Sequence, residues 1–200
     1  MLDGPLRPVK DQLLAPVVRG PLRAVPPLVV TGIALAAALG AGLAAWSSAP
    51  ALAVGLWLLS RLADGLDGAM ARHQASASDR GGLVDIVADT IGYAVVPLGI
   101  AAGIDTRTAW VVVAVLLATF YVNAVSWTYL AALLEKRAAG RGAATSTIMP
   151  RGLVEGAETI VVFTLALAWP SAAPGVLAVM AVAVGMTVVE RLWWSRAILT

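Results

Sequence analysis

Six long apolar segments run through the sequence, and they restrict what this chain can fold into more than any other feature. Each is close to the ~20 residues that an α-helix needs to cross the hydrocarbon core of a bilayer. Apolar residues make up 60% of the 200 residues and charged residues 13%, against roughly 45–50% and ~25% in a typical soluble domain. The mean hydropathy is +0.85. A soluble domain of this size could not bury so much apolar surface, so the sequence predicts an all-α integral membrane protein.

The predicted transmembrane helices are separated by breaks that contain Pro, Ser, Gly or Asp, as turns do. Their ranges are 28–46, 51–72, 82–103, 108–134, 152–169 and 174–194. Residues 28–200 would therefore form one six-helix membrane domain. The Pro-rich residues 1–27 would form a cytoplasmic or interfacial segment, either a broken amphipathic stretch on the membrane surface or an irregular tail.

The basic residues indicate how these helices cross the membrane, because cytoplasmic loops are enriched in Lys and Arg. With the N-terminus inside, 12 of the 14 basic residues fall on the cytoplasmic side, since only Arg107 lies in an outside loop and Arg61 lies within the second segment. Both termini are therefore predicted to be cytoplasmic. The net charge of +2 without a dense basic block makes nucleic acid an unsuitable partner.

Four carboxylates lie within the apolar segments, where charges are costly and usually functional. Asp64 and Asp67 are three residues apart near the end of the second segment, and Asp85 and Asp89 are four apart near the start of the third. Each pair shares a helix face, and the short turn between the segments should bring the pairs together. Their mutual repulsion would be removed by divalent cations, and an all-carboxylate set suits Mg²⁺ or Mn²⁺.

Zinc is a poor fit, because the chain has no Cys and a single His. A structural alternative is that Asp64 or Asp67 forms an ordinary helix-end salt bridge with Arg61 or Arg72. Four carboxylates beside small residues such as Gly68 favour a binding site over that alternative, because small side chains let a ligand or a helix approach closely.

The stretch from Asp64 to Asp89 resembles the signature of the CDP-alcohol phosphotransferase family, D-x2-D-G-x2-A-R-x8-G-x3-D-x3-D. All eight defined positions match, namely Asp64, Asp67, Gly68, Ala71, Arg72, Gly81, Asp85 and Asp89. The six-helix architecture of the family also agrees with the number of apolar segments. The resemblance implies transfer of a phosphoalcohol from a CDP-linked donor, usually CDP-diacylglycerol in bacteria, to an acceptor hydroxyl with release of CMP.

The resemblance also implies roles for individual residues. The four aspartates would hold two Mg²⁺ ions, and Asp89 would in addition be the general base that takes the proton of the acceptor. The CDP site would be lined by Asp64, Gly68, Ala71 and Arg72. Relatives often carry a Pro-Asn-x-x-Thr-type sequence before the first helix, whereas this chain has Pro26-Pro27-Leu28-Val29-Val30-Thr31, without Asn. Thr31 is therefore a further candidate for donor binding.

The acceptor site is predicted near the cytoplasmic start of the fifth segment. Gly152-Leu153-Val154-Glu155-Gly156-Ala157-Glu158-Thr159-Ile160 resembles a GLxEGxETI segment in a bacterial inner-membrane branch of the family. Glu155 and Glu158 share a helix face and could bind an amine or hydroxyls, or equally pair with arginines. Arg141 and Arg151 could attract a phosphorylated acceptor, although positive-inside bias alone would also place them there.

The sequence thus predicts a phosphatidyl transferase of phospholipid biosynthesis, with a small polyol phosphate such as inositol phosphate or glycerol 3-phosphate as acceptor. A serine or lipid acceptor is the alternative for the same chemistry. A small cation or proton transporter that uses the aspartates, and a catalytically inactive scaffold, are alternatives of other classes. The expected setting is the bacterial inner membrane, with the active site facing the cytoplasm and the chain forming a homodimer.

Overall fold

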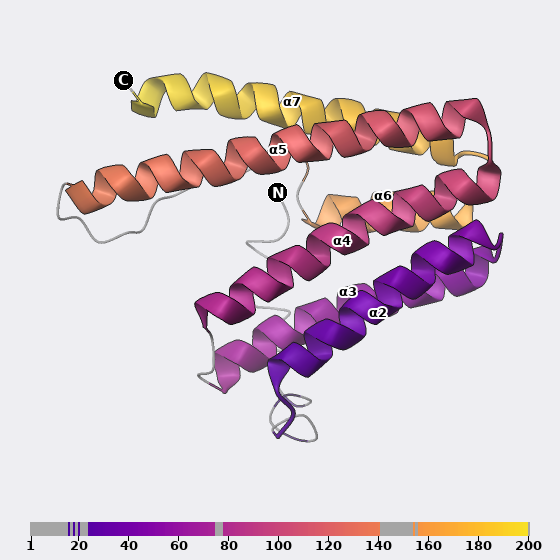
Figure 1. Ribbon diagram of the computed structural model, residues 1–200, viewed down its shortest axis with the longest axis horizontal. Helices are drawn as coiled ribbons and strands as arrows, with labels where there is room; N and C mark the ends of the chain where they lie inside the picture. Colours follow the sequence, from indigo (N-terminus) through magenta and orange to yellow (C-terminus); the bar gives the residue numbers. More distant parts are fainter. Residues whose placement is uncertain are drawn as a thin grey trace.

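The structure of the protein is a computed structural model, and it describes residues 16, 18, 20, 24–74, 78–140, 154 and 156–199, with side chains of 138–140 excluded. These residues contain six long helices and no strand, so the prediction of an all-helical chain is confirmed for this part. The helices, labelled as in Figure 1, are α2 (Pro27–Trp46), α3 (Pro50–His73), α4 (Asp79–Ile104), α5 (Arg107–Gly140), α6 (Gly156–Ala168) and α7 (Ala173–Leu199).

The helices begin and end at residues suited to those positions. Pro50 occupies the first turn of α3, where its missing N–H costs nothing. Ser78 caps α4 by accepting a hydrogen bond from the Gly81 N–H at 3.1 Å. At the other end of α4, Asp105 adopts a left-handed backbone with φ of 47° and its N–H bonds to the Ala101 carbonyl. This left-handed residue ends α4 and lets the chain reverse into α5.

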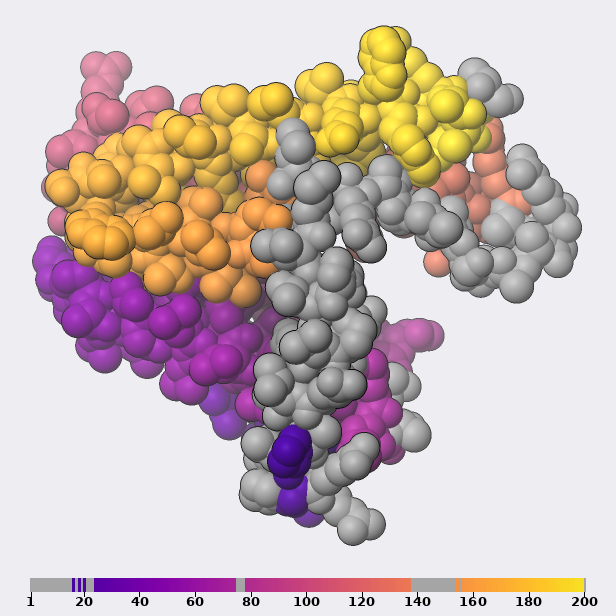
Figure 2. Space-filling view, turned by 180° about the vertical axis from the view of Figure 1, so that it is seen from behind, coloured from indigo at the N-terminus to yellow at the C-terminus, as the bar shows by residue number. Residues whose placement is uncertain are grey.

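Helix α2 packs along both α3 and α4, whereas α5 packs mainly along α7. Helix α6 contacts α3 on one side and α7 on the other, and so joins the two groups. Figure 2 shows α6 between α3 and α7 on one face of the molecule. The largest buried cluster lies among α2 to α7 and includes Trp57, Val96, Leu116, Phe163 and Leu177.

The contact between α2 and α4 depends on glycine. A Cβ atom on Gly99 would collide with the backbone carbonyl of Gly42, and one on Gly103 would collide with the carbonyl of Ala45. A Cβ on Gly42 would lie 2.7 Å from the carbonyl oxygen of Val95. Small residues at a helix interface let two backbones approach closely in an apolar setting, so this stretch of the two helices is packed backbone to backbone.

Within the part of the chain that the structure describes, four helices are long and apolar enough to cross a membrane by length and composition, namely α2, α4, residues 107–137 of α5, and α7. Large apolar side chains are exposed along them, including Leu43, Val111 and Val179, as a lipid-facing surface requires. Among the described residues, α3 carries several charges in its second half and α6 has only 13 residues. The predicted fifth segment began at Gly152, which lies outside the described residues.

Replacing Gly99 by Ala should weaken the α2–α4 contact. The added methyl group would strike the Gly42 backbone, and overpacking of this kind costs about 1–3 kcal/mol. We expect a lower thermal unfolding midpoint in detergent, measured by intrinsic fluorescence. Gly185→Ala is the matched control, because nothing lies within 4 Å of the position its Cβ would take. An unchanged midpoint for Gly99→Ala would contradict the packing described here.

Candidate active site

The four aspartates of the signature lie at the same end of two consecutive helices. Asp64 and Asp67 are in the last turns of α3, and Asp85 and Asp89 are in the first turns of α4. Figure 1 shows the end of α3 and the start of α4 at the same end of the bundle. Asp67 is almost completely buried, with 4% of its surface exposed, and Oδ1 of Asp85 is also buried. Carboxylates so placed require compensating groups nearby.

Thr31 is one such group. Its hydroxyl donates a 2.6 Å hydrogen bond to Oδ2 of Asp67, across 36 residues of sequence. Both side chains are buried, and a hydrogen bond to a carboxylate is shorter and stronger than one between neutral groups. The first turns of α2 therefore position Asp67, although the Pro-Asn-x-x-Thr entry is incomplete in this chain.

Arg61 is the second compensating group, and it joins the two helices that carry the signature. Its Nη1 atom donates to Oδ1 of Asp89 in an ion pair between α3 and α4. Among the described residues Arg61 therefore forms its ion pair with Asp89 on the neighbouring helix. It does not form the local helix-end salt bridge with Asp64 or Asp67 that the structural alternative required. Arg61 was not predicted as a site residue, and the signal available for it was a single Arg inside an apolar segment.

Gly68, Ala71 and Arg72 follow the aspartates on the last turns of α3. Arg72 is exposed, and its Nη1 atom would lie 3.2 Å from a Cβ atom on Gly68. The glycine therefore leaves room for the guanidinium group to lie back along the helix. A cation held there beside the carboxylates is suited to bind a phosphate.

The donor chemistry of the site fits a hard divalent cation, because the side chains at the two helix ends are carboxylates and a hydroxyl. One of these carboxylates, that of Asp89, is already paired with the guanidinium group of Arg61. In the part of the chain that the structure describes, no three Asp, Glu or His side chains are close enough together to hold a metal ion. The assignment of all four aspartates to metal binding therefore stays a prediction.

Most of the predicted acceptor residues cannot be placed. Arg141, Arg151 and Glu155 lie outside the described residues, whereas Glu158 is half-buried near the start of α6. The structure adds Arg191 on α7, which is 7% exposed and was counted in the sequence only as a cytoplasmic charge. Its Nη1 atom donates to the side chains of Asn123 and Ser126 on α5, at 2.9 and 2.6 Å. This buried cation fastens α7 to α5.

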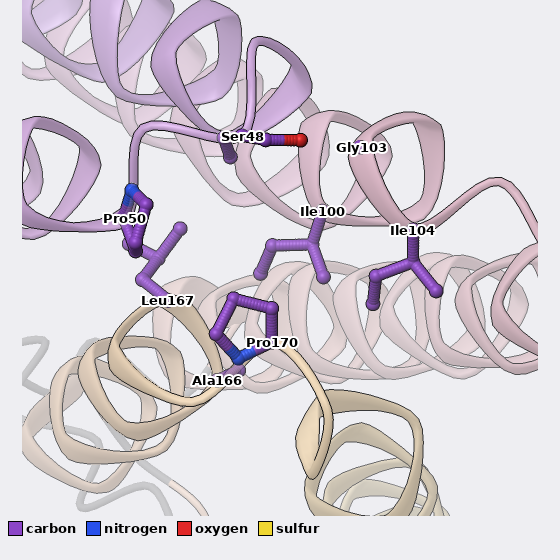
Figure 3. A pocket seen from close by; sticks show the side chains of 9 residues that line it. Ser48, Pro50, Ile100, Gly103, Ile104, Ala166, Leu167 and Pro170 are labelled. Atoms are coloured by element: carbon purple, nitrogen blue, oxygen red, sulfur yellow. The ribbon is translucent and has the colours of Figure 1, made fainter.

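Two cavities among the described residues lie at the end of the bundle opposite the aspartates. A small apolar cavity of about 160 Å³ is enclosed by the opposite ends of α2, α3, α4 and α6 (Figure 3), and its lining includes Ser48, Ile100, Leu167 and Pro170. A wider groove of about 730 Å³ between α2 and α4 reaches Trp46 and Trp110 at that same end. Both are lined mainly by apolar groups, so they offer little that could do chemistry.

The amino-acid sequence of this chain is similar to those of known proteins. The sequence profile of the CDP-alcohol phosphatidyltransferase family matches residues 24–194. Inner membrane protein YnjF of Escherichia coli (strain K12) is 34% identical over 142 residues, which are 68% of this chain and 66%, just under two thirds, of that relative.

Solved structures of one protein share the fold. Phosphatidylinositol phosphate synthase (PgsA1) of Mycobacterium tuberculosis with bound CDP-DAG superposes with a TM-score of 0.71 at 25% identity, over 90% of this chain and 92% of that one. The apo form of the same synthase has a TM-score of 0.63 at 26% identity, over 88% and 93%. The complex with manganese and citrate is 24% identical with a TM-score of 0.67, over 88% and 86%.

One class of protein is defined by the aspartates at the ends of α3 and α4 together with the helical fold and the sequence match. The chain belongs to the CDP-alcohol phosphatidyltransferase family, a match that covers the whole of α2 to α6 and nearly all of α7. The resemblance that the sequence analysis drew from eight positions is confirmed.

Thr31→Val should destabilise the protein by removing the hydrogen bond to Asp67 while keeping the shape of the side chain. The lost bond to a buried carboxylate is worth about 1.5–3 kcal/mol. We expect a lower thermal unfolding midpoint in detergent, and Thr31→Ser, which keeps the hydroxyl, should unfold close to wild type. Equal midpoints for Val and wild type would show that the bond contributes nothing.

Proposed function

We propose that this protein transfers a phosphatidyl group from CDP-diacylglycerol to an alcohol acceptor and releases CMP. The observation that carries the proposal is the complete eight-position signature, with its aspartates on the adjoining ends of α3 and α4. The fold similarity to PgsA1, whose structure contains CDP-DAG, supports the same donor. The reaction joins the acceptor oxygen to the phosphatidyl phosphorus and breaks the bond from that phosphorus to CMP.

The residues of the site suit the separate needs of this reaction. Asp64, Asp67, Asp85 and Asp89 would hold two Mg²⁺ ions, with Mn²⁺ as an alternative, and bound cations would neutralise the pyrophosphate and stabilise CMP as a leaving group. Arg72 would grip a phosphate of the donor beside Gly68 and Ala71. Asp89 would accept the hydroxyl proton of the acceptor as general base, provided that its carboxylate reaches the hydroxyl.

Thr31 would act indirectly in this scheme. Its 2.6 Å hydrogen bond orients the carboxylate of Asp67, and groups that orient a metal ligand tune the affinity for the ion. Donor lipid would reach the site from the side, because the surrounding helices expose apolar side chains such as Leu62 and Leu83. The acyl chains could then stay in the bilayer while the nucleotide lies at the helix ends.

For the acceptor we propose a small polyol phosphate, such as inositol phosphate or glycerol 3-phosphate. Lys136 and Arg137 near the end of α5 are exposed, and Arg141 and Arg151 follow them in the sequence. This stretch of sequence therefore carries a surplus of positive charge that suits a phosphorylated acceptor. Glu158 at the start of α6 would instead suit hydroxyls or an amine, so serine or a lipid is the alternative acceptor.

We further propose that all six helices cross the bacterial inner membrane with both termini in the cytoplasm, and that the protein forms a homodimer. Four helices have the necessary length and composition, and the relative YnjF is named as an inner membrane protein. The basic residues favour a cytoplasmic active site, because Arg72 near the end of α3 and Arg80 at the start of α4 lie at the same helix ends as the aspartates, and cytoplasmic segments are enriched in Lys and Arg.

The proposal is tested by a radiolabelled assay. Purified protein with Mg²⁺ and CDP-diacylglycerol should release CMP and form a new lipid only when a suitable acceptor is added. The panel should contain inositol phosphate, glycerol 3-phosphate, serine and a lipid alcohol. Asp89→Asn should lower turnover by at least about 10²-fold, the usual contribution of a general base, and chelation of the metal should abolish it.

Asp105→Asn is the matched control for that variant. It makes the same chemical change at the opposite end of α4, where Asn tolerates the left-handed backbone of this residue. It should keep wild-type turnover. Circular dichroism should show that both variants retain their helices, and normal turnover in a folded Asp89→Asn protein would remove Asp89 from the mechanism.

Orientation can be read by cysteine labelling, because the natural chain contains no Cys. Arg107→Cys should react with an impermeant maleimide in spheroplasts, since we place residue 107 outside. Arg80→Cys, which is equally exposed in the structure, should react only after the membrane is permeabilised. The reverse pattern would mean that the active site faces outward.

A further inference from the structure

A buried cation lies beside the predicted catalytic carboxylate without belonging to the signature. Arg61 is 8% exposed and lies three positions before Asp64 on α3. Its Nη1 atom bonds to Asp89 and its Nη2 atom donates to Ser60 Oγ at 3.0 Å. Burying an isolated guanidinium group in this apolar environment would cost much free energy. The ion pair with Asp89 compensates for that cost.

Aromatic rings hold the guanidinium group in place. Its central carbon lies 4.6 Å from the centre of the Trp57 ring and 5.2 Å from that of Tyr93, both within the range of cation–π attraction. Trp57 is fully buried, and its indole N–H donates to the carbonyl of Ile160 on α6 at 3.3 Å. The ring is also packed against Phe163, with 5.4 Å between centres, so one face of this cage is rigid.

A glycine of α4 leaves space for the guanidinium group of Arg61. Gly92 lies on α4 three residues beyond Asp89, and a Cβ atom there would be 3.5 Å from Nη2 of Arg61 and 3.2 Å from the Cβ of Ala38. The Nε atom of Arg61 is buried and has no hydrogen-bond partner among the described residues. Among the described residues the guanidinium group has Asp89 as its one salt-bridge partner, and the rings of Trp57 and Tyr93 lie against it.

We infer that Arg61 is a positioning residue, a fixed internal counter-cation that holds the Asp89 carboxylate against α3 and competes with divalent metal ions for it. This inference rests on the proposed function, which makes Asp89 a metal ligand and the general base. The guanidinium group neutralises Asp89 and joins α4 to α3 through this ion pair. A metal ion that binds Asp89 must share the carboxylate with Arg61 or displace it, and it is repelled by the guanidinium charge.

The consequence is that metal affinity is lowered by a residue outside the metal site. Arg61→Gln removes the competing charge and keeps a polar side chain that can still bond to Ser60. We expect this variant to bind Mn²⁺ about tenfold more tightly than wild type, because a unit charge within a few ångströms is removed. It should also unfold at a lower temperature without metal, and regain more stability on Mn²⁺ addition than wild type does.

The experiment uses the full-length protein in detergent and follows free Mn²⁺ by electron paramagnetic resonance. Arg107→Gln is the matched control, since it removes an exposed arginine at the opposite end of the bundle, and it should bind Mn²⁺ as wild type does. In an Asp89→Asn background, Arg61→Gln should raise the affinity by less than it does in the wild-type background, because the competition for Asp89 is gone and only the repulsion between the ion and the guanidinium charge remains.

Unchanged or weaker Mn²⁺ binding by folded Arg61→Gln would overturn the inference, as would an equal gain in the Asp89→Asn background. If Arg61→Gln does not fold, Arg61→Lys carries the test. It keeps the charge but not the planar group held between the rings, so we expect tighter binding than in wild type but a smaller gain than the one expected for Arg61→Gln, and wild-type affinity would overturn the inference.

Failure of the proposed function would look different. It would appear in the wild-type protein alone, as no CMP release from CDP-diacylglycerol with any acceptor, or as no Mn²⁺ binding at all. An active, Mn²⁺-binding wild type whose affinity does not respond to Arg61 would instead leave the proposed function standing and remove the role of Arg61.

Discussion

The packing of α2 against both α3 and α4 is the contact on which the candidate site depends. At one end the backbones of Gly42 and Gly99 meet without side chains between them. At the other end Thr31 bonds to Asp67. Because α2 is bound at both ends, the last turns of α3 and the first turns of α4 are held as neighbours, and the aspartates they carry come to one end of the bundle.

Charge in an apolar setting is the second constraint, and the chain meets it with pairs of groups from different helices. Arg61 of α3 neutralises Asp89 of α4, and Arg191 of α7 bonds to Asn123 and Ser126 of α5. Each pairing avoids the high cost of an unpartnered polar group in such surroundings. Since each also joins two helices, the same groups that could serve chemistry hold the bundle together.

Much of the fold could be predicted from sequence because the relevant patterns are local. Runs of apolar residues, with Pro50 and Asp105 at the turns between them, place most helix ends that can be compared within a few residues of those observed, whereas α5 and α7 extend six and five residues beyond their predicted ends. The site was partly predictable for a similar reason, since the spacing of the four aspartates is a property of consecutive turns of helix. The contacts of Arg61 and Arg191 could not be predicted, because a lone buried arginine in an apolar segment does not indicate which residue it will pair with.

The sequence by itself determined the class of the protein, since apolar composition selects the bilayer as solvent and eight residues in fixed spacing carry the family signature. Tertiary structure alone decided which groups meet. Thr31 and Asp67 are 36 residues apart and Arg61 and Asp89 are 28 apart, so no helical repeat relates them. Their contacts follow from how α2, α3 and α4 pack. That packing depends on the size of the side chains between the helices, and glycines, which have no side chain, allow the closest approach.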